Sequence, residues 1–210
     1  MTRIVIADDH AVVRKGLRLI LAETEGIEIA GEAASADELL TFLRSKRADA
    51  VILDVVLGDR DGIELLKHIR SEFPRMPVLM ISMHAEEIFA IRALRAGANG
   101  YIEKSAAPET IRDAVRRAAT GGTYMTAAVA ERLKDGLAHG EMRSLPHERL
   151  SDREFEIFRL LGLGKSVTEI AHALNLSVKT VSTHRTHILA KTGLASNADI
   201  VDYVTLNALR

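Results

Sequence analysis

The chain has 210 residues, and its hydrophobic content of 47% is enough for packed cores in one large domain or two small ones. A formal net charge of -1 gives no overall signal of polyanion binding. The sequence contains no cysteine, which excludes a disulfide framework and a thiolate metal site and suits a reducing compartment. Charges follow the N-terminal apolar residues too soon for a signal peptide, and no apolar stretch is as long as a membrane span, so we expect a cytoplasmic protein without a membrane partner.

The first 120 residues alternate between short apolar runs and segments whose apolar residues recur with helical period. The predicted strands cover residues 4–7, 27–30, 50–53, 78–81 and 100–102. The predicted helices cover residues 11–24, 36–46, 62–72, 85–96 and 108–120. Ser35 and Glu38 have the spacing of a capping box, and Pro108 suits the first turn of the fifth helix. Five such units predict an α/β fold, a doubly wound five-stranded parallel sheet covered on both faces.

Two adjacent carboxylates, Asp8 and Asp9, follow the first predicted strand, and Asp54 follows the third. Ligands of doubly wound sheets bind beyond the carboxyl ends of the strands, so we expect these three acids to converge on one pocket. Neighbouring anions repel unless a cation compensates them. Carboxylate oxygens suit Mg²⁺, which takes few protein ligands and keeps several waters. The sequence therefore predicts a Mg²⁺ site at these acids.

A hydroxyl and an ammonium complete the same edge of the predicted sheet, because Ser82 ends the fourth strand and Lys104 follows the fifth. Around a metal-bound carboxylate they form a site for a phosphoryl group, with Asp54 as nucleophile, since carboxylates can form acyl phosphates. Mg²⁺ would offset charge on the transferring group, and the two side chains would hold the product's oxygens. Taken singly, each acid could be a helix cap, the serine a turn residue and the lysine a solvated charge. The five positions together favour the phosphoryl site.

These positions belong to a larger set that matches a known family: Asp8-Asp9, Asp54, Asp61-Gly62, Ser82, Gly97-Ala98, Gly100-Tyr101 and Lys104. On these residues the segment 1–120 resembles the receiver domain of two-component response regulators. The resemblance implies that a sensor histidine kinase phosphorylates Asp54. It implies that Asp9, Asp54 and the carbonyl of Val56 hold Mg²⁺, with Asp8 acting largely through a bound water. It also implies that Tyr101 is the aromatic residue whose orientation reports the phosphorylated state.

Four positions depart from the receiver pattern. Where the family commonly has Met-Pro beyond the acceptor, this chain has Leu57 and Gly58. Glycine lacks the fixed φ of proline, so we expect a more mobile loop. Ser105 stands where many receivers have proline, and Met83 stands where small residues are frequent. The bulk of Met83 is expected to slow access to the acceptor, although both residues are common in the subfamily named below.

The strand pattern ends after residue 120. Residues 121–148 have the composition of a linker, with room for a short helix at 126–137. Residues 149–210 are predicted as a separate, small all-α domain of four helices. Two capping-box pairs support these helices, Ser151 with Glu154 and Ser166 with Glu169. The helices cover residues 152–162, 167–174, 178–191 and 197–208.

The middle two of these helices, separated by a tight turn, have the layout of a helix-turn-helix, whose second helix enters the major groove of DNA. Val181, Ile188 and Leu189 form an inward face of that helix. The segment from Lys165 to Lys191 contains four lysine or arginine side chains and one acid, a net charge of +3. A solvated helical surface could have this composition, but a local basic face also favours double-stranded DNA as partner.

A second set of residues sharpens this interpretation: Leu150-Ser151, Arg153-Glu154, Gly164, Glu169-Ile170-Ala171, Leu174, Leu176-Ser177, Lys179-Thr180-Val181, His184, Ile188 and Lys191. On these residues the segment 150–208 resembles a LuxR-type helix-turn-helix. Receiver and output together resemble the NarL/FixJ subfamily of transcription factors. The resemblance implies base-facing positions at Ser182, Thr183 and Thr186. It implies contact with, or proximity to, DNA phosphates at Lys179, Thr180, Arg185 and Lys191.

These features predict a response regulator that is not an enzyme. Phosphorylation of Asp54 is expected to shift the receiver, promote homodimerisation and control DNA binding and transcription, with RNA polymerase as a further candidate partner. One alternative is a metal-dependent phosphatase, but that class carries Asp-x-Asp where this chain has Asp54 followed by Val55-Val56. A regulator that works without phosphorylation is a second alternative. Separately, His184 and His187 have a spacing that could suggest a metal pair, but no carboxylate or cysteine completes one.

Overall fold

The structure is a computed structural model that describes residues 1–58, 60–83, 86–138, 145–207 and 209. The chain divides into two compact units, Met1–Glu141 and Met142–Arg210. Each unit has its own core and is described by itself. Among the described residues, no helix has both the length and the apolar composition needed to cross a bilayer.

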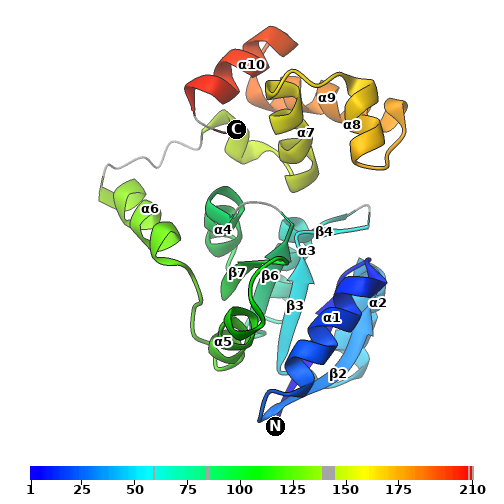
Figure 1. The fold of residues 1–210 in the computed structure, drawn as a ribbon, viewed down its shortest axis with the longest axis vertical. Helices are drawn as coiled ribbons and strands as arrows, with labels where there is room; N and C mark the ends of the chain where they lie inside the picture. Colours follow the sequence, from blue (N-terminus) through cyan, green and yellow to red (C-terminus); the bar gives the residue numbers. More distant parts are fainter. Residues whose placement is uncertain (59, 84–85, 139–144, 208, 210) are drawn as a thin grey trace. The chain divides into compact units, whose positions relative to one another are not determined.

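A five-stranded parallel sheet organises the first unit (Figure 1). Its strands are β1 (Thr2–Ala7), β2 (Ile27–Ala33), β3 (Ala50–Asp54), β6 (Val78–Ser82) and β7 (Gly100–Glu103). They lie in the order β2-β1-β3-β6-β7, and every neighbouring pair is parallel, which confirms the predicted doubly wound fold. The chain order reverses at β1 and β3, so their carboxyl ends form the switch point at which such folds bind ligands.

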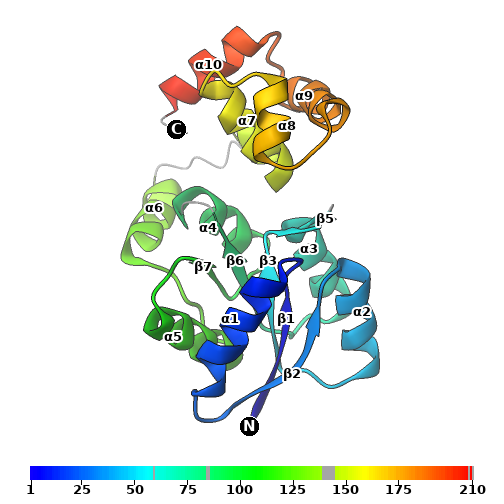
Figure 2. The same ribbon diagram turned by 45° about the vertical axis from the view of Figure 1, so that its right-hand side comes forward.

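Five helices cover the two faces of this sheet: α1 (Ala11–Ala22), α2 (Ala36–Ser45), α3 (Gly62–Glu72), α4 (Glu86–Arg95) and α5 (Pro108–Ala119). Leu17 of α1 and Ile111 of α5 belong to one apolar cluster with Ile52 and Ile81 of the sheet. Helices α2, α3 and α4 lie on the opposite face (Figure 2). Because both faces are covered, β3 and β6 are buried at every position, which is why they read as continuous apolar runs.

The second strand runs beyond the end that its apolar pattern predicts, to Ala33 instead of residue 30. Glu32 ends the apolar pattern, yet its backbone still pairs with Ile6. β2 is an edge strand, and the Glu32 carboxylate is bound by Arg14 and Arg18 of α1. The ion pairs therefore explain how a charged residue is accommodated inside the strand.

A short antiparallel hairpin follows β3, formed by β4 (Val56–Leu57) and β5 (Arg60–Asp61), and the sequence pattern does not predict it. Gly58, in its turn, has a φ of 61°, which proline cannot adopt. A proline at this position would therefore require a different local backbone conformation. Asp61 then caps α3 by accepting a hydrogen bond from the N–H of Ile63 at 2.8 Å.

The segment after α5 is bound to the free edge of β7. The N–H of Tyr124 donates to the carbonyl of Asn99 at 2.8 Å, and Tyr124 forms an isolated parallel bridge with Gly100. Helix α6 (Ala127–Ala138), the short helix that the sequence suggests, then packs against α4. The remaining predicted linker at 139–144 lies outside the described residues.

In the part of the second unit that the structure describes, four α-helices follow a 3-10 turn, in agreement with the prediction. Both predicted capping boxes, at Ser151 and Ser166, are present. In the first unit Ser35 caps α2 as predicted, but Glu38 accepts from the N–H of Ala34 and so does not close the box. The elements are η1 (Pro146–Arg149), α7 (Asp152–Gly162), α8 (Val167–Ala173), α9 (Val178–Thr192) and α10 (Asn197–Leu206).

Candidate functional site

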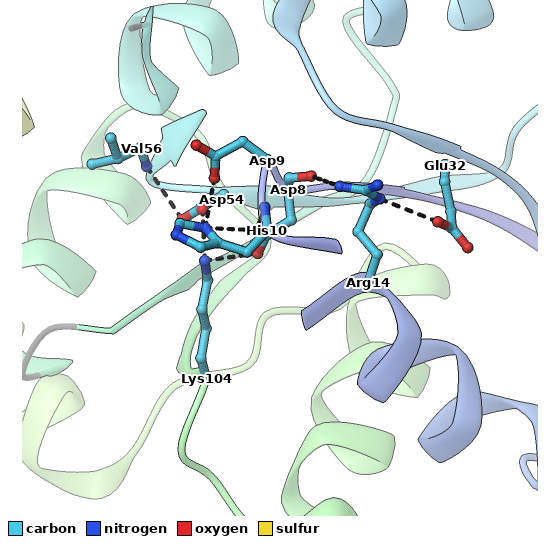
Figure 3. A network of polar contacts seen from close by, with 8 residues as sticks. All are labelled: Asp8, Asp9, His10, Arg14, Glu32, Asp54, Val56 and Lys104. Carbon is cyan, nitrogen blue, oxygen red and sulfur yellow. Dashed lines mark hydrogen bonds and ion pairs between the residues drawn. The ribbon is translucent and has the colours of Figure 1, made fainter. Parts of the chain in front are cut away.

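Three carboxylates meet at the switch point of the sheet (Figure 3). The register of β1 against β3 pairs Ala7 with Leu53, so Asp8, directly after β1, and Asp54, the last residue of β3, lie at neighbouring strand ends. Both are buried, whereas the Asp9 side chain is 35% exposed. One ligand atom from each of the three acids and one from His10 lie within 4.8 Å of one another. The predicted convergence of the acids is therefore present in the structure.

Lys104 bridges the two buried acids. Its Nζ lies 2.6 Å from Oδ2 of Asp54 and 2.7 Å from Oδ2 of Asp8, and its side chain is buried with them. The lysine reaches this position because β7 ends beside β6, where its N–H donates to the carbonyl of Ser82 at 2.7 Å. The ammonium thus compensates the carboxylate repulsion that the sequence suggests a metal ion would relieve.

Burial dominates the protonation of the central acid. It raises the pKa of Asp54 to about 6; the nearby Lys104 lowers it, and the Asp8 carboxylate raises it further. Burial alone would lower the pKa of Lys104, but attraction to Asp54 and Asp8 outweighs burial and raises it above its usual value. At neutral pH Asp54 is therefore ionised although burial disfavours its charged form, and it lies next to a cationic lysine.

The remaining predicted residues of this site lie around the three acids. Ser82 is buried at the carboxyl end of β6, next to Glu103 of β7. The N–H of Val56 donates to Oδ1 of Asp54 at 3.2 Å, which places Val56 beside the acceptor. Tyr101 is buried in β7, paired in register with Met80 of β6. Ser82 and Val56 therefore lie at the carboxyl edge of the sheet with the acids, whereas Tyr101 lies inside β7.

The donor set fits a hard divalent cation. Asp8, Asp9 and Asp54 offer carboxylate oxygens, the ligands that Mg²⁺ prefers. His10, which sequence reasoning missed, contacts the acids through its Nδ1, 2.6 Å from Oδ1 of Asp9. Its position directly after the paired acids was the available signal. Within the described residues this is the only group of three or more potential metal ligands.

Met83 is 72% exposed directly after Ser82. Its side chain also lines a small apolar cavity together with Leu17 and Ile111, on the face covered by α1 and α5. The expected effect of its bulk on access to Asp54 stays a prediction.

In the second unit, α8 and α9 form the predicted helix-turn-helix. The turn places Asn175 in the left-handed region, with a φ of 53°, and Ser177 caps α9 by accepting from the N–H of Thr180 at 3.0 Å. Val181 and Ile188 are buried as predicted, whereas Leu189 is only half-buried. The exposed residues on the opposite side of α9 include Lys179, Ser182, Thr183 and Thr186.

Two of the predicted phosphate-contacting residues also make contacts within this unit. Arg185 is half-buried, and its Nε donates to Oδ1 of Asn197 at 2.6 Å. Nζ of Lys191 lies 2.6 Å from Oε2 of Glu154, a buried acid that also accepts from the N–H of Ser151. Both cations therefore help to hold α9 against its neighbours. Sequence reasoning missed these roles because the partners lie far along the chain.

The histidines of α9 are placed differently from a metal pair. Burial lowers the pKa of His184, although the nearby Glu154 carboxylate acts in the opposite direction and raises it. Nδ1 of His187 lies 3.8 Å from Oε1 of the same acid. These residues surround a structural carboxylate that Lys191 already binds, which favours a packing role for them.

Family comparisons agree with this geometry. A model of the response regulator receiver domain matches residues 4–116, and a model of the luxR family of bacterial regulatory proteins matches residues 148–204. The chain belongs to the response regulators. This response regulator carries a receiver domain and a LuxR-type DNA-binding domain, the organisation of the NarL/FixJ subfamily.

Relatives match the response regulator over nearly its whole length. Response regulator UvrY of Escherichia coli is 30% identical over 95% of this chain and 92% of its own. Response regulator protein VraR of Staphylococcus aureus is 32% identical over 96% of this chain and 95% of its own. Among solved structures, RcsB of Salmonella enterica serovar Typhimurium, bound to the promoter rprA in the presence of the phosphomimetic BeF3-, is 29% identical, with a TM-score of 0.62 and coverage of 97% and 98%.

Proposed function

We propose that this response regulator accepts a phosphoryl group on Asp54 from a sensor histidine kinase, and that the modification controls transcription. The observation that carries the proposal is the geometry at the switch point. Asp54 is buried there, 2.6 Å from the ammonium of Lys104 and within 4.8 Å of ligand atoms of Asp8 and Asp9. A carboxylate in this setting is placed to attack phosphorus, with a cation ready to hold an oxygen of the product.

The transfer forms a bond between an Asp54 oxygen and phosphorus and breaks the P–N bond of the kinase phosphohistidine, returning the bonding electrons to the imidazole. When bound, Mg²⁺ offsets charge on the transferring group. Asp8, Asp9, Asp54 and the Val56 carbonyl would hold it. Before transfer, Lys104 pairs with the unphosphorylated Asp54 carboxylate. After transfer, Lys104 pairs with one phosphoryl oxygen, and the Ser82 hydroxyl donates a hydrogen bond to a second phosphoryl oxygen.

The energy of these contacts is sufficient for a switch. Phosphorylation adds roughly two charges and strong acceptor oxygens. Moving an equilibrium from 1:99 to 99:1 takes about 5.5 kcal/mol. Two or three charge-assisted hydrogen bonds of about 1.5–3 kcal/mol each, from Ser82, Lys104 and nearby amides, give about 3–9 kcal/mol, a range that includes that figure. We expect Tyr101 to report the shift and the surface of α4, β7 and α5 to form the homodimer.

The output is DNA binding by α9. Its exposed hydroxyls at Ser182, Thr183 and Thr186 are suited to reading base edges in the major groove. Lys179, Thr180, Arg185 and Lys191 would lie along the DNA phosphates. The related RcsB is bound to promoter DNA in its solved structure, which supports DNA binding as the output. Contact with RNA polymerase stays a prediction.

A phosphatase is the less favoured alternative. Enzymes of the Asp-nucleophile class carry a second acid two residues after the nucleophile, and here that position is Val56, preceded by the buried Val55. The chain therefore has no acid at the position from which enzymes of that class protonate the leaving group. We therefore propose a phosphoacceptor whose own dephosphorylation is slow.

Intact mass spectrometry after incubation with acetyl phosphate and Mg²⁺ tests the site assignment. We expect one phosphoryl group per wild-type chain, none on Asp54→Asn, and a sharply reduced fraction on Asp9→Ala because metal binding is lost. Equal labelling of Asp54→Asn and wild type would show that the acceptor is another residue.

A further inference from the structure

The turn that carries the paired acids is tied down at three points. The N–H of Asp8 donates to the carbonyl of Ala33 at 3.1 Å, and the N–H of His10 donates to Oδ1 of Asp8 at 2.8 Å. The carbonyl of Asp8 accepts from Nη1 of Arg14 at 2.7 Å (Figure 3). That carbonyl belongs to the peptide group joining Asp8 to Asp9. Arg14 therefore holds the backbone from which the Asp9 side chain projects.

Arg14 is itself held in place. Its Nε donates to Oε2 of Glu32 on β2 at 3.1 Å, and its side chain is 17% exposed. Arg18, one turn further along α1, binds the other oxygen of Glu32. The pKa of Glu32 is lowered mainly by its hydrogen bond to Arg18, against burial, and also by Arg14. Glu32 is therefore ionised at neutral pH and fixes the guanidinium plane of Arg14.

Asp9 depends on this backbone support. Its carboxylate is 35% exposed, and its ion-pair partner His10 is 67% exposed. Neither side chain is packed firmly enough to fix the other. The direction of the Asp9 side chain is therefore set by its backbone, and that backbone is fixed by Arg14.

We infer that Arg14, oriented by Glu32, is a positioning residue that keeps the Asp9 carboxylate directed at Asp54 and so sets the affinity of the acid cluster for a divalent cation. The inference rests on the proposed function, because it takes Mg²⁺ as the ion. It adds a role for two residues outside the acid cluster. Their contribution acts through the Asp8–Asp9 peptide and requires no contact with the metal.

Electrostatics and positioning predict opposite changes in Mg²⁺ affinity for the Arg14→Ala variant. Removing a cationic side chain near a cation site reduces repulsion, so charge alone predicts that Arg14→Ala binds Mg²⁺ more tightly. Loss of positioning predicts weaker binding, and outer-shell partners of metal ligands commonly contribute 10–100-fold in affinity. The direction of the change therefore separates the two effects.

The experiment is isothermal titration of Mg²⁺ into the full-length wild type, Arg14→Ala, Arg14→Lys and Arg18→Ala, each checked by circular dichroism to be folded at the titration temperature. We expect Arg14→Ala to bind Mg²⁺ about tenfold more weakly. Arg14→Lys keeps the charge but loses the planar fork that reaches both Glu32 and Asp8, so it should also bind more weakly. Arg18→Ala is the matched control, because Arg18 shares Glu32 but does not contact Asp8; we expect it within twofold of wild type.

Unchanged or tighter binding by Arg14→Ala would overturn the inference, as would equal weakening by Arg18→Ala. If Arg14→Ala does not fold, Arg14→Lys decides, and wild-type affinity in that variant overturns the inference. In each of these cases the proposed function still holds, provided that the wild-type protein binds Mg²⁺. Absence of Mg²⁺ binding by the wild type would overturn both.

Discussion

Asp54 is ionised at neutral pH although burial raises its pKa to about 6 from 3.8. Between these two values the folded chain binds more protons than the unfolded chain, so the contribution of Asp54 to stability falls as the pH rises and is lost above about 6. We therefore predict that Asp54→Asn stabilises the metal-free first unit at pH 7 by about 1–3 kcal/mol, since one pKa unit corresponds to about 1.4 kcal/mol.

Urea titration followed by the backbone amide signals of β1 and β3 measures this effect in the first unit alone. The extra stability of Asp54→Asn over wild type should decrease as the pH falls from 7 to 5. Added Mg²⁺ should also decrease it, because the ion stabilises the wild type. A variant that is no more stable than wild type at pH 7 would show that Lys104 fully compensates the buried carboxylate.

The acids, Ser82 and Lys104 were predictable because each lies at or just beyond the carboxyl end of an apolar strand, and parallel strands present these ends at one edge of the sheet. Arg14 and Glu32 were not, because their contact depends on how α1 packs against β2. The same holds for Lys191 and Glu154, which are far apart in sequence and form an ion pair. Spacing along the chain reports local structure, and these contacts are set by tertiary packing.

At the scale of elements, the parallel sheet was predictable because its central strands are apolar at every position. The end of β2 was not, because Glu32 breaks the apolar pattern while the backbone pairing continues. The β4–β5 hairpin also escaped prediction, since its strands have only two residues each. Short elements of this kind carry too few residues to show a period.

One side chain joins several elements at the amino end of the sheet. Oδ1 of Asn99 accepts from Nη2 of Arg70 at 2.7 Å and from the N–H of Val78 at 3.1 Å. Its Nδ2 donates to the carbonyls of Gly121 and Gly122, at 3.4 and 3.3 Å. Asn99 thereby connects α3 and β6 to the turn that follows α5.

We predict that Asn99→Ala loosens these elements locally. Leaving a buried donor or acceptor unpaired costs about 1–3 kcal/mol, so the amide of Val78 should exchange with solvent about tenfold faster or more. Hydrogen exchange followed by NMR measures this, and the amides of β2, at the opposite edge of the sheet, serve as the internal control. Unchanged exchange at Val78, or equal acceleration in β2, would contradict a local role for Asn99.

At the scale of the whole molecule, the chain combines a receiver domain with a LuxR-type DNA-binding domain, and the proposed function divides phosphorylation and DNA reading between them. Pairing two DNA-binding domains makes the second contact effectively intramolecular, which raises avidity without a new contact. We therefore expect phosphorylated dimers to favour paired half-sites about 10 base pairs apart, one turn of the DNA helix. Phosphorylation would then control DNA binding by controlling the dimer.

DNA-binding titration, with and without acetyl phosphate and Mg²⁺, tests this coupling most directly. The duplex is first selected from a random library with phosphorylated wild type, and a scrambled duplex measures non-specific binding at the same salt concentration. We predict that phosphorylation strengthens specific binding by the wild type at least tenfold, about 1.4 kcal/mol, and leaves Asp54→Asn unchanged. An equal response in Asp54→Asn, or no response in a wild type that mass spectrometry shows to be phosphorylated, would contradict control of DNA binding through Asp54.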